Sequence, residues 1–336
     1  MKIKCPLCGN ENYFTGLEDE GTRFCSNCNE PLHSEITESK DIKEAEYEII
    51  KPEVNTIQSA KKIRSVSERF SSIPEHQRIS ISKIKDSKCP FKYYKNYIEE
   101  PREEKPFFSI ELGLGQFFHG KVEWLFKTIA SQKRKITKED ILEINDVINE
   151  FEISFLWDGK LREPYKIIGS YHFGYFKDRL VNIIQNFNRY IIPKLVGHDV
   201  ISTEGNLQIR TDDFVIRGKY DLITQDQKNR LTLWDWKTGR MPKPDFYEEF
   251  TLQKIQLGIY AVWIRYKYET SNVIANVVFL RDSAEFLKEV FEYYLEEKVI
   301  NFIENQYKVL KSITSYAPIP NNLCPWCSWK SKCRYE

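Results

Sequence analysis

The pattern of apolar and polar positions divides the chain into a helical part and a later part rich in strands. Over residues 138–195, apolar side chains such as Ile141 and Ile144 recur at the spacing of an amphipathic helix. From His198 onward, short apolar runs alternate with polar turns, which is typical of strands. The hydrophobic pattern therefore predicts that helices precede a sheet.

The second half of the chain contains the elements of an α/β core. Strands are predicted at His198–Glu204, Leu207–Ile223 and Leu231–Thr238, with breaks at Gly205-Asn206 and at Thr211–Asp213; a helix follows at about 246–268, then a strand at Asn272–Asp282 and a long helix at about 284–313. Three strands, a helix and another strand, with helices on either side, predict an α/β core with a mixed sheet.

Two earlier segments also have helical signals. Ser80 or Ser82 is a candidate N-cap for a helix that passes Ile84 and continues beyond Cys89-Pro90. Leu112–Phe126 is expected to be a glycine-rich turn entering an amphipathic helix, with His119 near its start.

Composition limits the classes of protein to consider. The chain has 336 residues, 41% of them hydrophobic, and a formal net charge of +1, so any nucleic-acid surface must be local. No apolar run approaches the roughly 20 residues that span a bilayer, and the first residues lack a signal-peptide core. We expect a cytoplasmic protein without a membrane partner, whose eight cysteines are metal ligands rather than disulfides.

The first four cysteines form two close pairs, a spacing typical of zinc sites. The pairs are Cys5 with Cys8 and Cys25 with Cys28. Zn²⁺ prefers four thiolates in a tetrahedron, which a short hairpin can supply. Residues 1–33 are therefore predicted to form a zinc ribbon, either a docking module or a nucleic-acid contact, and the polar residues 34–77 a linker to a domain at 78–336.

The other four cysteines are distributed over the two ends of that domain. Cys324, Cys327 and Cys333 have the spacing of a metal site that lacks one ligand. Cys89 is the remaining cysteine and completes a second group of four, although a lone cysteine is also a common small core residue. Cysteine number does not distinguish zinc from an iron–sulfur cluster, because both accept four thiolates.

The candidate chemistry lies between Gly218 and Arg240. Asp221 lies on one predicted strand, and Asp235 and Lys237 are two positions apart on the next, so these two side chains share a face. Two carboxylates and an ammonium suit a hard divalent cation and a phosphate. Alone, Asp235 and Lys237 could equally be a surface ion pair. Glu204, at a predicted strand end, is a further candidate acidic contact.

These residues match a known pattern in the right order. Gly218-Lys-Tyr-Asp221, Asp235-Trp-Lys237 and Gln256-Leu-Gly-Ile-Tyr260 resemble the G-x-x-D, (D/E)-x-K and Q-x3-Y motifs of RecB-like PD-(D/E)XK nucleases. His119 resembles their upstream metal-binding histidine. Cys89 with the three C-terminal cysteines is similar to the four-cysteine iron–sulfur variant, found in CRISPR-associated exonucleases and the AddB nuclease domain. The resemblance implies a restriction-endonuclease-like core; the zinc ribbon lies outside it.

The resemblance also implies an activity and its cofactors. His119, Asp221, Asp235 and the backbone carbonyl of Trp236 would bind Mg²⁺ or Mn²⁺, with Lys237, Gln256 and Tyr260 around the phosphate. A [4Fe–4S] cluster would occupy Cys89, Cys324, Cys327 and Cys333.

The expected activity is that of a DNA nuclease, in particular an exonuclease on single strands or duplex ends, in repair, recombination or CRISPR adaptation. A helicase or a CRISPR integrase subunit is the candidate protein partner. The alternative is a catalytically silent nucleic-acid-binding scaffold. The basic stretches Ser131–Lys138, Lys160–Arg162 and Trp329–Arg334 are candidate backbone contacts.

Overall fold

The computed structural model describes the backbone of residues 2–4, 11–13, 23–24, 31–32, 63–67, 74, 77–101, 103–242, 247–290, 293–321 and 324–333. Met1–Val54 and Asn55–Glu336 form two compact units. In the first, β1 (Lys2–Lys4) pairs with β2 (Glu11–Tyr13), and β3 (Arg23–Phe24) with β4 (Pro31–Leu32), both antiparallel. The first four cysteines, and the strand expected near Tyr47, lie outside the described residues.

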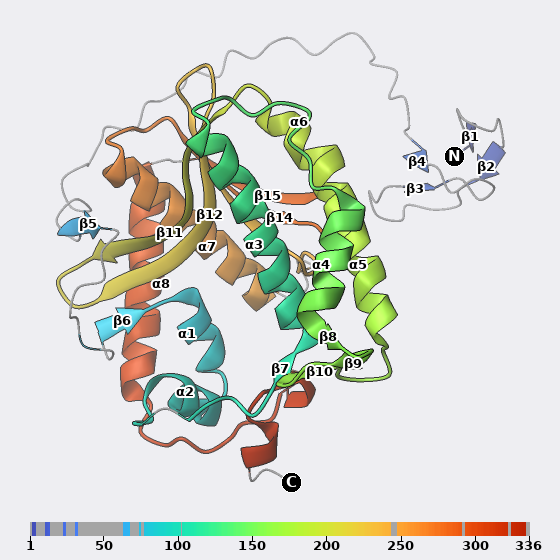
Figure 1. Ribbon diagram of the computed structural model, residues 1–336. Helices are drawn as coiled ribbons and strands as arrows, with labels where there is room; N and C mark the ends of the chain where they lie inside the picture. Colours follow the sequence, from blue (N-terminus) through green and yellow to red (C-terminus); the bar gives the residue numbers. More distant parts are fainter. Residues whose placement is uncertain are drawn as a thin grey trace. The chain divides into compact units, whose positions relative to one another are not determined.

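A seven-stranded mixed sheet is the centre of the second unit (Figure 1). Its strands are β5 (Ser65–Ser67), β6 (Arg78–Ile79), β11 (Asp199–Arg210), β12 (Val215–Gln225), β13 (Leu231–Lys237), β14 (Val273–Phe279) and β15 (Glu285–Val290). The order is β15-β14-β13-β12-β11-β5, with β6 beside β12. Only β13 with β14 and β12 with β6 are parallel among the pairs of this sheet. The predicted mixed sheet is confirmed.

Helices cover both faces of this sheet. They are α1 (Ile81–Asp86), α2 (Pro90–Tyr97), α3 (Ile110–Ser131), α4 (Ile144–Phe155), α5 (Phe173–Asn186), α6 (Ile192–Leu195), α7 (Tyr247–Lys267) and α8 (Tyr293–Ser312), with a π-helical turn at Phe187–Ile191. Side chains alternate along β13, so Leu233 packs with α7 and α8 while Trp234 and Trp236 pack with α3 and α5. No described helix is both long and apolar enough to cross a bilayer.

Several predicted boundaries are confirmed. Ser80 caps α1, because its Oγ accepts a hydrogen bond from the backbone N–H of Lys83 at 3.2 Å. The turn at Thr211–Asp213 separates β11 from β12. The helix expected at 246–268 is α7, and it makes the crossover that parallel neighbours such as β13 and β14 require.

Two predicted breaks are wrong, and glycine is the reason in both. Gly205 does not end a strand but continues β11 opposite Tyr220, where a Cβ atom would lie 2.0 Å from the tyrosine hydroxyl oxygen. Gly113 does not belong to a turn but lies inside α3, where a Cβ would meet the Phe155 ring at 2.6 Å. Each glycine permits close packing inside an element rather than ending it.

The helix expected from Ala284 is also wrong at its start. Glu285–Val290 forms β15, an antiparallel edge strand on β14, and α8 begins only at Tyr293. Leu287 points into the core shared with α7 and α8, while Phe286 packs on the opposite side. This alternation is the strand period, which the helical pattern of the following residues obscures.

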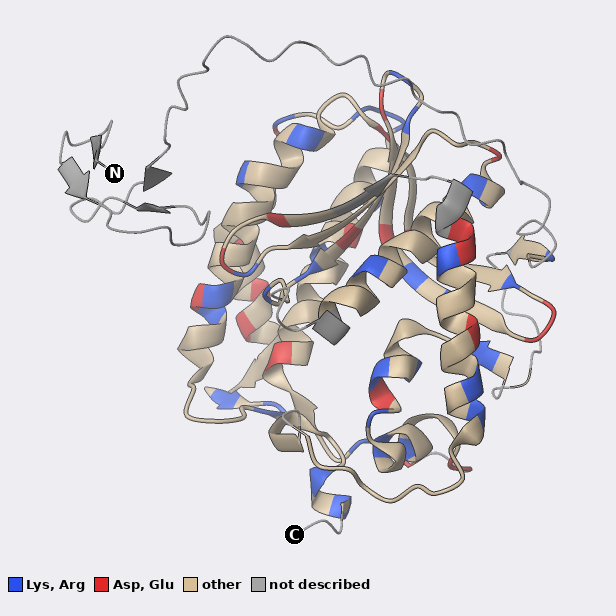
Figure 2. Cartoon of the chain, turned by 180° about the vertical axis from the view of Figure 1, so that it is seen from behind, with Lys and Arg blue, Asp and Glu red and all other residues tan. Residues whose placement is uncertain are grey.

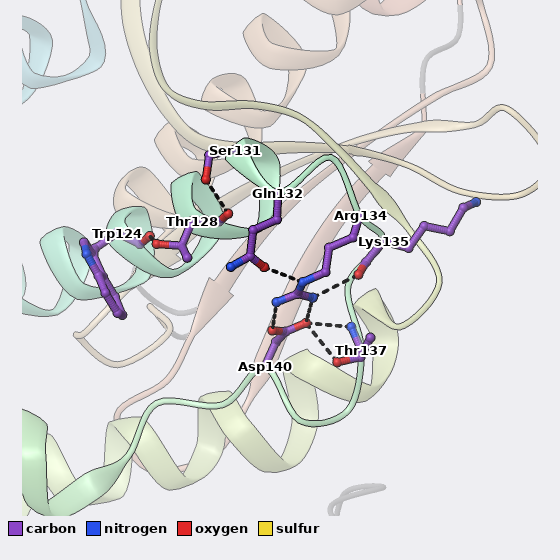
Figure 3. Close-up of polar contacts among 8 residues, drawn as sticks. All are labelled: Trp124, Thr128, Ser131, Gln132, Arg134, Lys135, Thr137 and Asp140. Carbon is purple, nitrogen blue, oxygen red and sulfur yellow. Dashed lines mark hydrogen bonds and ion pairs between the residues drawn. The ribbon is translucent and has the colours of Figure 1, made fainter.

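The loop after α3 is held by one buried carboxylate (Figure 3). Asp140 accepts two hydrogen bonds from the Arg134 guanidinium, at 2.5 and 2.6 Å, and one from the backbone N–H of Thr137 at 2.8 Å. The hydrogen bond from Arg134 outweighs burial and lowers the pKa of Asp140. Arg134, from the basic stretch Ser131–Lys138, is thus engaged within the fold.

Candidate active site

A cleft of about 720 Å³ opens at the carboxyl end of β13. Its walls come from α1, α3, β11, β12, β13 and α7. Each of the predicted chemical residues outside the cysteine groups lines it, apart from Trp236; they are His119, Asp221, Asp235, Lys237, Gln256 and Tyr260. The fold therefore brings together side chains from elements far apart in the sequence.

The two aspartates lie where β12 and β13 separate. The backbone pairing of these strands ends at Leu222 with Trp234, and Asp221 and Asp235 are the next residues beyond that pair. Asp221 Oδ2 accepts a hydrogen bond from the backbone N–H of Trp236 at 2.6 Å. The Asp221 carboxylate thus takes the place of a backbone carbonyl of β12 as the acceptor for this N–H. The hydrogen bond holds Asp221 beside β13.

His119, Glu204 and Asp221 form a cluster of potential metal ligands. One ligand atom from each lies within 4.8 Å of the others, an arrangement that no other three His, Cys, Asp or Glu residues make in the described part of the chain. His119 Nδ1 lies 2.9 Å from Asp221 Oδ1. Two carboxylates and an imidazole suit Mg²⁺ or Mn²⁺, so the donor set fits the expected ion.

Glu204 belongs to this cluster although the sequence motifs do not include it. It lies on β11 with a left-handed backbone, at φ 44°, directly before Gly205. Burial, and then the charge of Asp221, raises the pKa of Glu204. Its position at a strand end was the only sequence signal, because its neighbours in space come from another strand and from α3.

Asp235 is buried and forms an ion pair with the half-buried Lys237 beside that cluster. Lys237 Nζ lies 2.5 Å from Asp235 Oδ2. Tyr260, from α7, has one hydroxyl hydrogen to donate and lies 3.0 Å from Asp235 Oδ1 and 2.7 Å from the Lys219 carbonyl oxygen. Gln256 Nε2 donates to the same hydroxyl. Asp235 is therefore oriented from both sides, by its own strand and by the helix.

The pKa values of Asp235, Lys237 and His119 are all raised, but burial has opposite effects on the acid and on the two bases. Burial, reinforced by Asp221, raises the pKa of Asp235. For Lys237, burial alone would lower the pKa, but Asp235 and Asp221 outweigh it and raise it. Burial also opposes protonation of His119, and the hydrogen bond and charge of Asp221 again raise its pKa. Without a cation, the site thus retains positive charge on its own side chains, and Lys237 is an ammonium rather than a base.

The second cysteine group also comes together. Cys89, Cys324, Cys327 and Cys333 all line one small pocket of about 120 Å³, next to Phe91 and Ile319. Burial raises the pKa of Cys327, so a metal bound here would have to displace a proton.

A buried tryptophan attaches the same C-terminal segment to α2. Trp329 is 1% exposed, and its Nε1 donates to Asn96 Oδ1 at 2.9 Å. Asn96 in turn donates to Asp86 Oδ2 at 2.8 Å. Lys332 pairs with Glu103, so part of the third basic stretch is also engaged. Figure 2 shows, from one side, that Lys and Arg positions are interspersed with Asp and Glu along the described elements.

Comparison with known proteins identifies the family of this second unit. The family model of the PD-(D/E)XK nuclease superfamily matches residues 78–334. A crystal structure from Eubacterium rectale named "Putative exonuclease" is similar with a TM-score of 0.43 and 11% identity, over 80% of this chain and 95% of that one. The structure of SSO0001 gives 0.29 and 14%, over 75% and 94%. No curated protein sequence matches the chain.

Proposed function

The chain belongs to the PD-(D/E)XK nuclease superfamily, and on that premise we propose that it is a metal-dependent DNA nuclease of the RecB-like type. The observation that carries the proposal is the cleft itself, where His119, Glu204 and Asp221 lie beside the Asp235–Lys237 pair. The expected reaction is hydrolysis of phosphodiester bonds, by exonuclease action on single-stranded DNA or duplex ends.

The site residues divide into three roles. His119, Glu204, Asp221, Asp235 and the Trp236 carbonyl are the proposed ligands, and Mg²⁺ or Mn²⁺ bound by them would neutralise phosphate charge and supply an acidic water. Asp235 and Asp221 raise the pKa of Lys237 in the ion-free site, and its ammonium would stabilise negative charge on the phosphate. Tyr260 and Gln256 hold Asp235 in place through the tyrosine hydroxyl.

We also propose a [4Fe–4S] cluster at the four-cysteine pocket. All four cysteines line one pocket, as the ligands of a single metal group would, and the resemblance to the four-cysteine nucleases favours the cluster over zinc. Such a cluster would connect Cys89 with the end of the chain and close the domain. Three further parts of the proposal are supported by sequence alone. The N-terminal cysteines bind zinc, and the nuclease domain is related to that of AddB. The protein acts with a helicase or a CRISPR integrase subunit, in repair, recombination or CRISPR adaptation.

The direct test is digestion of end-labelled single-stranded DNA with Mg²⁺ or Mn²⁺. Wild type should shorten the DNA, and Asp235→Ala and Lys237→Ala should not. Asp213→Ala is a matched control, because it removes an exposed turn carboxylate outside the cleft. If wild type leaves the DNA intact, or if the two cleft variants cleave as it does, the chain is the catalytically silent scaffold instead.

A further inference from the structure

A second polar pocket lies at the opposite end of β13 from the cleft. It has a volume of about 350 Å³, within the usual range for small-molecule sites, and opens on the α6 side of the sheet. Thr232 and Trp234 of β13 and Asn276 of β14 line it. Strand alternation puts these side chains on the face away from Asp235 and Lys237, so the two pockets are separate.

The floor of this pocket contains polar groups that make no hydrogen bond to other described residues. Thr232 is 5% exposed and Asn276 is 6% exposed, and neither side chain makes a hydrogen bond or ion pair within the described part of the chain. Neither has an atom among the unpaired polar atoms that are sealed from solvent there, so the hydroxyl and the amide are open to the pocket. Both are therefore available to hydrogen-bond with a ligand.

The rim of the pocket consists of hydrogen-bond donors. Arg230 pairs with Asp226 at 2.9 Å through Nη2, but its buried Nε has no partner among the described residues. Lys194 lies on α6, with its ammonium 5.2 Å from the centre of the Phe286 ring. Both cations reach the same cavity, which also has an aromatic wall of Trp234 and Phe286.

His198 contributes a further donor because of how it is hydrogen-bonded. Thr224 Oγ1 accepts a hydrogen bond from Trp234 Nε1 at 3.0 Å and lies 3.2 Å from His198 Nδ1. The Thr224 hydroxyl can donate its own hydrogen to Nδ1. In that tautomer the neutral ring carries its proton on Nε2, and this tautomer is the one that the proposal uses. An arginine, a lysine and an imidazole N–H thus surround the pocket.

We propose that this pocket binds a small phosphorylated ligand of nucleotide size. The phosphate would be bound by Arg230, Lys194 and His198, and a ring with donors and acceptors would pair with Asn276 and Thr232. An oxyanion accepts hydrogen bonds from all three rim groups, and charge-assisted bonds of this kind are the strongest available. The Asn276 amide both donates and accepts, as recognition of a nucleobase edge requires. This site is independent of the nuclease reaction.

Equilibrium binding to the full chain in EDTA tests the site without any cleavage. The ligands are the four deoxynucleoside 5′-monophosphates, inorganic phosphate and deoxyadenosine, each measured by calorimetry. We expect at least one monophosphate to bind about tenfold or more tightly than phosphate or the nucleoside, because both halves of the pocket contribute. Equal affinity for the monophosphate and either fragment would overturn the nucleotide assignment.

Variants locate the binding. Arg230→Gln and Asn276→Leu should each weaken it by about tenfold or more. Lys228→Gln, which removes an exposed charge from the same turn, should not. Asn276→Leu should melt no lower than wild type, since it replaces an unpaired amide. If Arg230→Gln is unstable, the affinity of Asn276→Leu alone shows whether the ligand binds at this pocket. Three outcomes would overturn the proposal. Wild type could bind no monophosphate, or the Arg230→Gln and Asn276→Leu variants could bind as tightly as wild type. Binding could also be lost in Lys237→Ala but kept in Arg230→Gln.

Discussion

The cleft and the cysteine pocket surround their reactive side chains with different environments, one charged and the other mainly apolar. In the cleft, opposite charges lie in contact: half-buried Asp221 contacts His119, and buried Asp235 contacts Lys237. The cysteine pocket is mainly apolar, and the packing of Trp329 against α2 attaches its C-terminal part to the domain. The comparison suggests that the first region performs chemistry and the second holds the chain together. Substitutions in the cleft should therefore reduce cleavage, and substitutions around the cysteine pocket should reduce stability.

The largest effect is expected for Asp221→Asn. This change removes the negative charge that contacts His119 and belongs to the cluster with Glu204. Cleavage should fall by about 10²-fold or more, the loss seen when one electrostatic group of an active site is removed. Calorimetric titration with Mn²⁺ should show weaker binding at the same time. A variant that binds Mn²⁺ and cleaves as wild type does would exclude Asp221 as a ligand.

The next largest effect is on stability, for Trp329→Ala. The side chain is 1% exposed and donates to Asn96, so its removal leaves a large cavity and an unpaired acceptor. The free energy of unfolding should decrease by about 3–5 kcal/mol, as measured by urea denaturation. Trp157→Ala is the control, because that side chain is 72% exposed and should change stability little. Equal effects of the two would mean that Trp329 does not anchor this segment.

Cys324→Ala tests whether the pocket holds a metal group. Loss of one thiolate should lower the metal content and the melting temperature, while molecules that remain folded keep their cleavage rate. A visible absorption spectrum of anaerobically purified protein distinguishes an iron–sulfur cluster from zinc, which has no such band. Full metal content and unchanged melting in this variant would remove the proposed connection between Cys89 and the chain end.

The smallest effect is expected for Asp140, which lines neither the cleft nor the cysteine pocket. Asp140→Asn should reduce the free energy of unfolding by roughly 1.5–3 kcal/mol at neutral pH, because the carboxylate accepts charge-assisted hydrogen bonds from Arg134. Its folded-state pKa is lowered, so this contribution is present above the unfolded value of about 3.9 and is lost as pH falls through the folded value. Denaturation curves at several pH values should show the variant and wild type converging in acid.

Much of the fold and the cleft could be predicted from sequence because the signals are local. The Asp235-Trp-Lys237 spacing places both side chains on one face of β13, and Ser80 is a capping residue before an apolar run. Glu204 was recognised only as a candidate contact, because its partners lie on other elements.

The predictions at Gly205, Gly113 and β15 were wrong for one reason, which is that each depends on a partner distant in the sequence. Gly205 and Gly113 look like chain breaks in sequence, and only the partner ring shows that they are packing positions. β15 depends on pairing with β14, which no local pattern records.

The assignment of chemistry to the cleft and of stability to the cysteine pocket is tested most directly by the single-turnover cleavage rate of labelled single-stranded DNA in Mn²⁺. Wild type, Lys237→Ala and Trp329→Ala are compared at a temperature where melting curves show all three folded. We predict that Lys237→Ala loses about 10²-fold or more in rate while Trp329→Ala keeps the wild-type rate. A Lys237→Ala protein that cleaves as fast as wild type, or an equal loss in both variants, would contradict the assignment of chemistry to the cleft.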